Sequence, residues 1–263
     1  MVFAKKSLGQ NFLMHTQTAE RIVEAANLPK DATVLEIGPG TGMLTRVLLA
    51  HVAKVVAVEA DDTLAPQLSE TFSDKISAGK LEVIHADIRE FNPTSLGNTY
   101  YLVANIPYYI TGEILRQFLS GPNKPKSITV LVQKEVAERI ARNNAKESLL
   151  SLSVKVFGEP KYCFTVPRGA FMPAPSVDSA VLTIQNIQNS VFVNQEAEHW
   201  FFSVLHAGFA HKRKRLAKNL EAIAPASDVA EAFTSLGLDT NIRSEDVPVE
   251  MWKKLAEGLQ GAA

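Results

Sequence analysis

Short apolar segments rich in β-branched residues alternate with helix-like stretches through the first two thirds of the chain. The expected strands span residues 33–38, 54–60, 81–87, 100–105, 127–133, 161–166 and 179–184. The expected helices span residues 16–27, 41–52, 62–72, 111–120, 134–143 and 147–157. This alternation predicts an α/β fold with a mostly parallel, seven-stranded sheet covered by helices on both faces, whose ligands bind at the carboxyl ends of the strands.

The last third of the chain follows a different pattern. Residues 196–220 and 228–238 are expected to be helical, and no strand is expected after Ile187. We therefore expect two domains, with the sheet in residues 1–187 and a small helical domain in residues 188–263.

Composition excludes several classes of protein. The N-terminus lacks the apolar run of a signal peptide, and no segment approaches the roughly 20 apolar residues of a membrane span. The single cysteine, Cys163, rules out an intrachain disulfide, and the six histidines show no spacing typical of a metal site. We expect a soluble, cytoplasmic monomer without a membrane partner or a metal.

The motif LEIGPGTG places three glycines, Gly38, Gly40 and Gly42, between a strand and a helix. Glycine allows a tight turn and lets a ligand approach the main chain closely. The G-x-G-x-G spacing differs from the dinucleotide pattern, and Pro39 removes a main-chain donor that a pyrophosphate would need. The motif therefore favours a ligand without phosphates, the alternative being an ordinary tight turn.

Two carboxylates end the next two strands. Glu59 can accept both hydroxyls of a ribose. Asp87 can accept a hydrogen bond from an adenine amino group, with Ile88 packing on the ring. Together with Gly38 and Gly40, these residues predict an adenosyl site, most economically one for S-adenosyl-L-methionine.

The motif NIPYYIT begins where the fourth strand ends, on the same expected rim. The Asn105 side-chain oxygen and the Ile106 carbonyl can accept the two hydrogens of an adenine 6-amino group and aim its lone pair at a methyl donor. Pro107 restricts Ile106 to extended geometry, and Tyr108 offers a face for stacking a base taken out of its helix. Tyr109 is expected to pack into the core.

A basic cluster lies late in the chain, although the formal net charge is only -1. It consists of Lys212, Arg213, Lys214, Arg215 and Lys218. We expect one continuous helix whose apolar stripe, from Phe202 to Leu220, largely excludes these residues. A solvated basic face is the usual explanation, but the cluster also predicts contact with RNA phosphates. The predicted surface is extended by Lys5, Lys6, Arg139, Arg142 and Lys146.

Together these motifs resemble the KsgA-type ribosomal RNA small-subunit adenine dimethyltransferases over nearly the whole chain. The shared segments are KKSLGQNFL, LEIGPGTGMLT, VVAVEAD, HADI, NIPYYIT, FMPAPSVDSAV and FFSVLHAGFAHKRKRLAKNL…LGLDTNIRSEDVPVEMWKKLA. The resemblance implies a Rossmann-like class I methyltransferase domain followed by a helical RNA-binding domain. It also implies S-adenosylmethionine-dependent dimethylation of two adjacent adenosines near the 3′ end of small-subunit (16S) rRNA during subunit assembly.

The resemblance also implies roles for individual residues. Asn11 and Leu13 would contact the cofactor alongside Gly38, Gly40, Glu59, Asp87, Ile88 and Asn105. Phe171 would form a second aromatic wall around the target adenine, opposite Tyr108, although its residue type alone favours a loop anchor.

Three other functions remain open from the sequence. A related large-subunit rRNA methyltransferase shares the glycine motif and the NIPY stretch, but the C-terminal helical pattern argues against it. A binding-only assembly or transcription factor would lack the cofactor residues. A nicotinamide dehydrogenase is disfavoured by the glycine spacing.

Overall fold

The structure, a computed structural model, describes residue 5, residues 8–142 and residues 146–260. The chain divides into two compact units, one of residues 1–138 and 159–187 and the other of residues 139–158 and 188–263. The sequence predicted a single boundary after residue 187. The structure differs in grouping residues 139–158 with the C-terminal unit, because the helical pattern of this segment does not reveal which unit it packs against.

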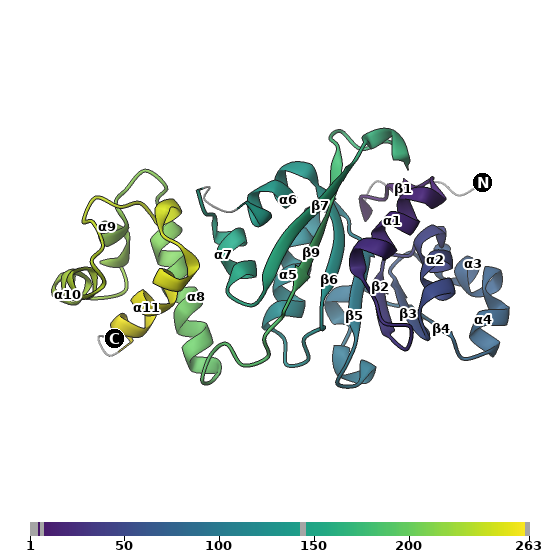
Figure 1. Ribbon diagram of the computed structural model, residues 1–263, viewed down its shortest axis with the longest axis horizontal. Helices are drawn as coiled ribbons and strands as arrows, with labels where there is room; N and C mark the ends of the chain where they lie inside the picture. The colour runs from purple at the N-terminus through teal and green to yellow at the C-terminus, as the bar shows by residue number, and fades with distance from the viewer. Residues whose placement is uncertain (1–4, 6–7, 143–145, 261–263) are drawn as a thin grey trace. The chain divides into compact units, whose positions relative to one another are not determined.

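The first unit contains a seven-stranded sheet in the order β4-β3-β2-β5-β6-β9-β7 (Figure 1). Its strands are β2 (Thr33–Ile37), β3 (Lys54–Glu59), β4 (Leu81–His85), β5 (Tyr101–Asn105), β6 (Ile128–Gln133), β7 (Glu159–Val166) and β9 (Ser179–Gln185). Strands β2 to β6 pair in parallel, whereas β9 pairs antiparallel with both β6 and β7. The predicted mostly parallel α/β fold is confirmed.

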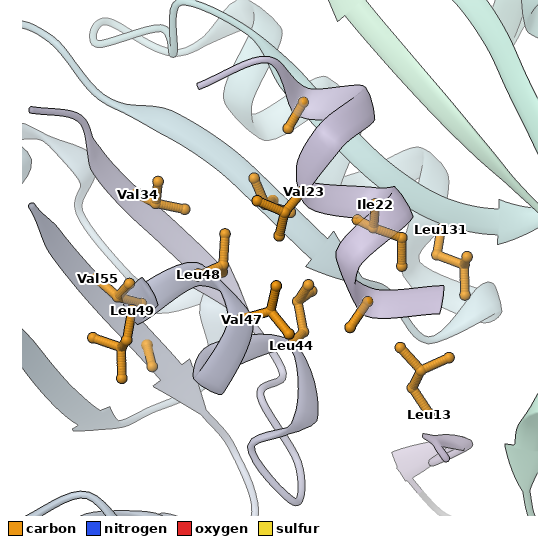
Figure 2. Packing of buried hydrophobic residues seen from close by; sticks show 14 of the residues in the cluster. Leu13, Ile22, Val23, Val34, Leu44, Val47, Leu48, Leu49, Val55 and Leu131 are labelled. Atoms are coloured by element: carbon orange, nitrogen blue, oxygen red, sulfur yellow. The ribbon is translucent and has the colours of Figure 1, made fainter. Parts of the chain in front are cut away.

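Helices accompany these strands at the predicted places, and α4 (Ser73–Ser77) is an additional short helix that was not predicted. The others are α1 (Thr16–Ala26), α2 (Met43–His51), α3 (Leu64–Thr71), α5 (Thr111–Ser120) and α6 (Lys134–Ala141). Figure 2 shows Ile22 and Val23 of α1 and Val47 and Leu48 of α2 pointing into the space between the two helices and the sheet. This apolar cluster buries one face of the parallel strands and holds their ends in place.

A small two-stranded sheet lies outside the main one. Strand β1 (Phe12–Leu13) pairs antiparallel with β8 (Phe171–Met172), matching Phe12 to Met172 and Leu13 to Phe171. Each strand is only two residues long, which is too short to leave an alternating pattern in the sequence. The pairing ties the N-terminal segment to the first unit.

The second unit contains helices and loops but no strand among its described residues. It contains α7 (Leu149–Lys155), α8 (Gln195–Phe209), α9 (Leu216–Leu220), α10 (Ala226–Leu236) and α11 (Val249–Leu259). The predicted continuous helix over 196–220 is wrong, because α8 stops at Phe209 and α9 starts at Leu216. Asn219 stabilises the break by donating to the carbonyl oxygens of Gly208 and His211, at 2.6 and 3.2 Å. No helix in the described ranges has the length and apolar character needed to cross a membrane.

Candidate active site

An open cavity of about 1060 Å³, counting the space at its mouth, lies at the carboxyl ends of β2 to β5. The chain runs from β2 through β3 to β4 in one direction across the sheet and then from β5 to β6 in the other. The cavity is therefore at the switch point of the strand order, where open α/β sheets bind ligands. The predicted residues that line it are Asn11, Leu13, Gly38, Gly40, Glu59, Asp87, Ile88, Asn105, Pro107 and Tyr108.

The glycine loop turns directly from β2 into α2. Gly38, Gly40 and Gly42 all have positive φ, of 64°, 58° and 80°, a conformation that L side chains rarely adopt. A Cβ on Gly40 would also lie 3.0 Å from the Phe12 ring, and one on Gly42 would lie 2.6 Å from the Phe72 ring. The loop thus requires glycine for its backbone conformation and, at two positions, for close packing.

Glu59 lines the cavity and is hydrogen-bonded to the main chain. Its two carboxylate oxygens accept the main-chain N–H groups of Gly40 and Asp61, at 2.9 and 3.0 Å. Burial raises the pKa of Glu59, and these two hydrogen bonds oppose that rise. Each carboxylate oxygen keeps a second lone pair, so Glu59 can still accept hydrogen bonds from a ligand with paired hydroxyls.

The Asp87 carboxylate is paired with a side-chain cation, whereas the Glu59 carboxylate accepts main-chain N–H groups. The Arg89 Nε lies 3.0 and 3.1 Å from the two Asp87 oxygens, and Arg89 Nη2 lies 2.5 Å from Oδ2. This pairing lowers the pKa of Asp87. Ile88 is buried beside it, and its carbonyl accepts the Gln117 side chain at 2.9 Å. Asp87 is therefore an ionised acceptor at the edge of the cavity.

Asn105 ends β5 with its side chain held in one orientation. Its Nδ2 donates to the main-chain oxygen of Asn11 at 3.0 Å. Asn11 in turn donates from its own side chain to the Gly9 carbonyl at 3.2 Å. Because the Asn105 amide nitrogen is occupied, its Oδ1 is the atom left to accept a hydrogen bond from a ligand.

Tyr108 follows Pro107 in a short 3₁₀ turn, η4 (Tyr108–Ile110). Its hydroxyl lies 2.6 Å from the Ser179 Oγ at the start of β9. Burial raises the pKa of Tyr108, so the phenol remains neutral near pH 7. The ring is anchored at its far end while it lines the cavity.

Phe171 and Tyr109 differ in their burial. Phe171 is only 4% exposed and belongs to the apolar core cluster with Leu13 and Ile22. Phe171 is not among the residues that line the cavity, but it pairs with Leu13, which is. Its role as a second aromatic wall, which the resemblance implies, stays a prediction. Tyr109 was predicted to be buried, but this is wrong, because its side chain is 63% exposed. It lies in η4, where the chain turns away from the sheet.

Glu36 is a cavity residue that the sequence reasoning missed. It lies within β2, is 1% exposed, and neither carboxylate oxygen forms a well-directed hydrogen bond among the described residues. Burial raises the pKa of Glu36 to about 8; contacts with Thr45 oppose this rise, and the charge of Glu59 adds to it. An acid inside an otherwise apolar strand, two residues before the first glycine, was the available signal.

The basic cluster lies in the second unit. Lys212, Arg213, Lys214 and Arg215 occupy the exposed turn between α8 and α9, and Lys218 lies in α9. Among the described residues, Lys218 is the one cluster member with an ion pair, to Glu221 at 2.5 Å.

The residues predicted to extend the basic cluster are partly engaged elsewhere. Lys5 pairs with Asp61 and Asp62, at 3.1 and 2.5 Å, and Lys146 pairs with Glu245. Lys6 lies outside the described residues.

Comparison with known proteins places this arrangement among RNA-modifying enzymes. Residues 1–260 match the protein family described as Ribosomal RNA adenine dimethylase. A protein of Dehalococcoides mccartyi named Ribosomal RNA small subunit methyltransferase A is 40% identical, over 96% of this chain and 87% of its own. A Fusobacterium nucleatum protein of the same name is 34% identical over 98% of both chains.

Two solved structures share the fold over most of the chain. A dimethyladenosine transferase from Plasmodium falciparum superposes with a TM-score of 0.79 at 25% identity, covering 93% of this chain and 95% of its own. The 23S rRNA methyltransferase ErmE gives a TM-score of 0.75 at 29% identity, covering 95% and 100%.

Proposed function

The chain belongs to the ribosomal RNA adenine dimethylase family and is a methyltransferase, and from this premise we propose its cofactor and its substrate. We propose that it uses S-adenosyl-L-methionine to dimethylate the 6-amino groups of two adjacent adenosines near the 3′ end of small-subunit (16S) rRNA. The orientation of Asn105, with its nitrogen occupied and its oxygen available, is the observation that carries the proposal. We further propose that it acts as a cytoplasmic monomer on an assembling small ribosomal subunit.

The cavity suits an adenosyl cofactor in shape and in chemistry. Glu59 offers acceptors for the ribose hydroxyls, and Asp87 offers one for the adenine amino group beside the apolar Ile88. The glycine loop leaves the main chain uncovered where a side chain would otherwise project. The cofactor, when bound, supplies an electrophilic methyl group on a sulfonium centre.

The protein's own part in the reaction is to orient the target amino group. The Asn105 Oδ1 and the Ile106 carbonyl would accept its two hydrogens, so that the nitrogen lone pair no longer lies in conjugation with the ring. The ring of Tyr108 would stack on the extruded base, and its bond to Ser179 holds that ring in place. The methylated nitrogen is acidic and releases its proton readily, so orientation and preorganised dipoles provide most of the catalysis.

The helical unit would contribute contact with RNA phosphates. The basic cluster is exposed, and four of its five members lie in one turn. If about five phosphates are neutralised, the logarithm of the RNA affinity should fall with the logarithm of salt concentration with a slope of roughly −3 to −5. A slope near zero would contradict this role.

The direct test is methyl transfer to small subunits that lack the modification, followed by nucleoside analysis. Dimethyladenosine should appear at two adjacent positions with the wild-type protein. Glu59→Gln should reduce cofactor affinity by about 10-fold or more, because the ribose hydroxyls lose a charged acceptor. If a correctly folded, cofactor-bound protein formed no dimethyladenosine, the proposal would be rejected.

A second candidate is methylation of large-subunit rRNA. It is favoured by the likeness to ErmE, which extends over the full length of that chain. Parallel assays with protein-free 23S rRNA and with unmodified small subunits would separate the two candidates. We expect transfer to the small subunit alone.

A further inference from the structure

Tyr109 presents an aromatic ring at the mouth of the cavity. Its side chain is 63% exposed, yet the ring is supported from one side by Gly9. A Cβ on Gly9 would lie 3.0 and 3.1 Å from two Tyr109 ring atoms, and Gly9 has a φ of 59°. The absence of a side chain at Gly9 thus lets the ring rest on the main chain. A supported, exposed ring is a ready surface for stacking.

A second hollow adjoins the cavity on the side of α5. It has a volume of about 930 Å³, counting its open space. Its lining residues are Arg89, Gly112, Glu113, Arg116 and Gln117. Arg89 lines both the cavity and the hollow, and Tyr109 precedes Gly112 by three residues. The stacking surface and the hollow are therefore neighbours on one rim.

The two arginines of the hollow are in different states. Arg89 is engaged by Asp87, through three contacts between their side chains. Arg116 is exposed and forms no ion pair within the described part of the chain. Its guanidinium is available for an anion, while the exposed carboxylate of Glu113 in the same hollow disfavours a small free anion. The combination suits a ligand that carries both a phosphate and a base with amino groups.

We propose that Tyr109 and this hollow form a second nucleotide subsite, which takes the nucleotide next to the target adenosine. Tyr109 stacks on the base of that nucleotide, and Arg116 contacts its phosphate. Glu113 accepts a hydrogen bond from an exocyclic amino group of the base. This inference rests on the proposed function, because it assumes an RNA strand whose target base enters the cavity.

The subsite explains how the protein can present one base of an adjacent pair at a time. A strand with its target base at Tyr108 must direct the neighbouring base elsewhere. Tyr109, the next residue along the chain, offers that base an exposed surface at the mouth of the cavity. Stacking there compensates for the contacts that the base loses on leaving its helix.

The test compares variants by their KM for RNA and by their affinity for the cofactor. Tyr109→Ala should raise the KM for RNA about 10-fold, whereas Tyr109→Phe, which keeps the ring, should change it less than about 2-fold. Arg116→Ala should raise it about 3- to 10-fold. Lys126→Ala is the matched control, because Lys126 is an exposed cation just before the amino end of β6, whereas the cavity lies at the carboxyl ends of the parallel strands. Cofactor affinity should not change in any variant.

An abasic substrate makes the test specific. Two RNAs lack the base on the 5′ or on the 3′ side of the target adenosine. One of them should raise the wild-type KM by the same factor as Tyr109→Ala, and combining that RNA with the variant should give no further loss.

Three results would overturn the subsite. They are unchanged kinetics in Tyr109→Ala, fully additive losses with both abasic RNAs, and a loss confined to cofactor affinity, which would mean that Tyr109 only supports Gly9. Failure of the proposed function looks different, because the wild-type protein would then transfer no methyl group to any of these RNAs.

Discussion

The cavity rim of the first unit and the basic cluster of the second hold their polar groups in opposite ways. At the rim, Glu59 accepts two main-chain N–H groups, and Asn105 donates to a main-chain oxygen. In the basic cluster, four side chains stand in an exposed turn, and only Lys218 has an ion pair among the described residues. Hydrogen bonds to the main chain therefore fix the orientation of the rim side chains. The side chains of the basic cluster share a positive charge and a place in the chain, but few contacts orient them.

This difference fits two distinct roles, the orientation of a reacting group and the electrostatic attraction of RNA. Orienting an amino group depends on the direction of individual lone pairs, so the acceptors must be held before the ligand arrives. Attraction to a phosphate backbone depends on the number of charges and tolerates side-chain motion. Substitutions that preserve charge or size should therefore have very different effects in the two regions.

Asn105→Asp is the sharpest test of the rim and has the largest expected effect. The change keeps the size of the side chain but removes the donor to Asn11 and adds a negative charge. We expect methyl transfer to fall by about 10²- to 10³-fold, because the acceptor loses its fixed direction. RNA affinity, measured in parallel, should change little. Activity within about 5-fold of the wild type would contradict a preorganised rim.

Replacing Lys212, Arg213, Lys214 and Arg215 together with alanine should weaken RNA binding by about 100-fold at moderate salt. The log–log salt slope should become less steep by about 3, as four phosphate contacts are lost. The matched control changes Arg213 and Arg215 to lysine, which keeps the charge and should leave the slope nearly unchanged. A large loss in that control would mean that the cluster also relies on guanidinium geometry.

The buried carboxyl group of Glu36 should make the stability of the folded protein depend on pH. Between pH 4.5 and about 8 the unfolded chain has released the Glu36 proton that the folded protein retains. The contribution of this group to the free energy of unfolding therefore falls by up to about 1.4 kcal/mol per pH unit as the pH rises. Glu36→Gln should remove that slope. Denaturant unfolding of both proteins at several pH values measures it, and parallel curves would refute the raised pKa.

Tyr108→Phe has the smallest expected effect. It removes the hydrogen bond to Ser179 but keeps the ring, so activity should fall only about 2- to 10-fold. Tyr108→Ala, which removes the stacking face as well, should lower activity further. Steady-state kinetics with RNA as the varied substrate distinguish the two. Equal losses in both variants would show that the hydroxyl, not the ring, is what matters.

Much of the first unit could be predicted because its signals are local. Strands β2 to β6 are apolar and flanked by turns, and glycines or polar side chains mark their carboxyl ends. Since those ends meet at one rim in a parallel sheet, Glu59, Asp87 and Asn105 could be placed together without a structure.

The features that the sequence did not predict depend on contacts between residues far apart in the chain, and such contacts leave no periodic pattern in the sequence. The β1–β8 pair is too short to show alternation, and Tyr109 is exposed because its ring rests on Gly9, a contact between distant parts of the sequence. The break between α8 and α9 depends on Asn219 reaching back to Gly208. Gly208 must itself be glycine, since a Cβ there would lie 2.3 Å from the Trp252 ring.

The way residues 139–158 join the C-terminal helices has a practical consequence for dissecting the protein. Phe157 is 1% exposed, and its ring stacks 6.0 Å from that of Phe202 in α8 and meets the edge of Phe192. A truncation at residue 187 removes both aromatic partners and leaves an apolar side chain and the inner face of α7 open to water. Exposed apolar surface of this kind promotes aggregation of the fragment. The second unit is built from two separate stretches of chain and cannot be removed by a single cut without exposing part of its core.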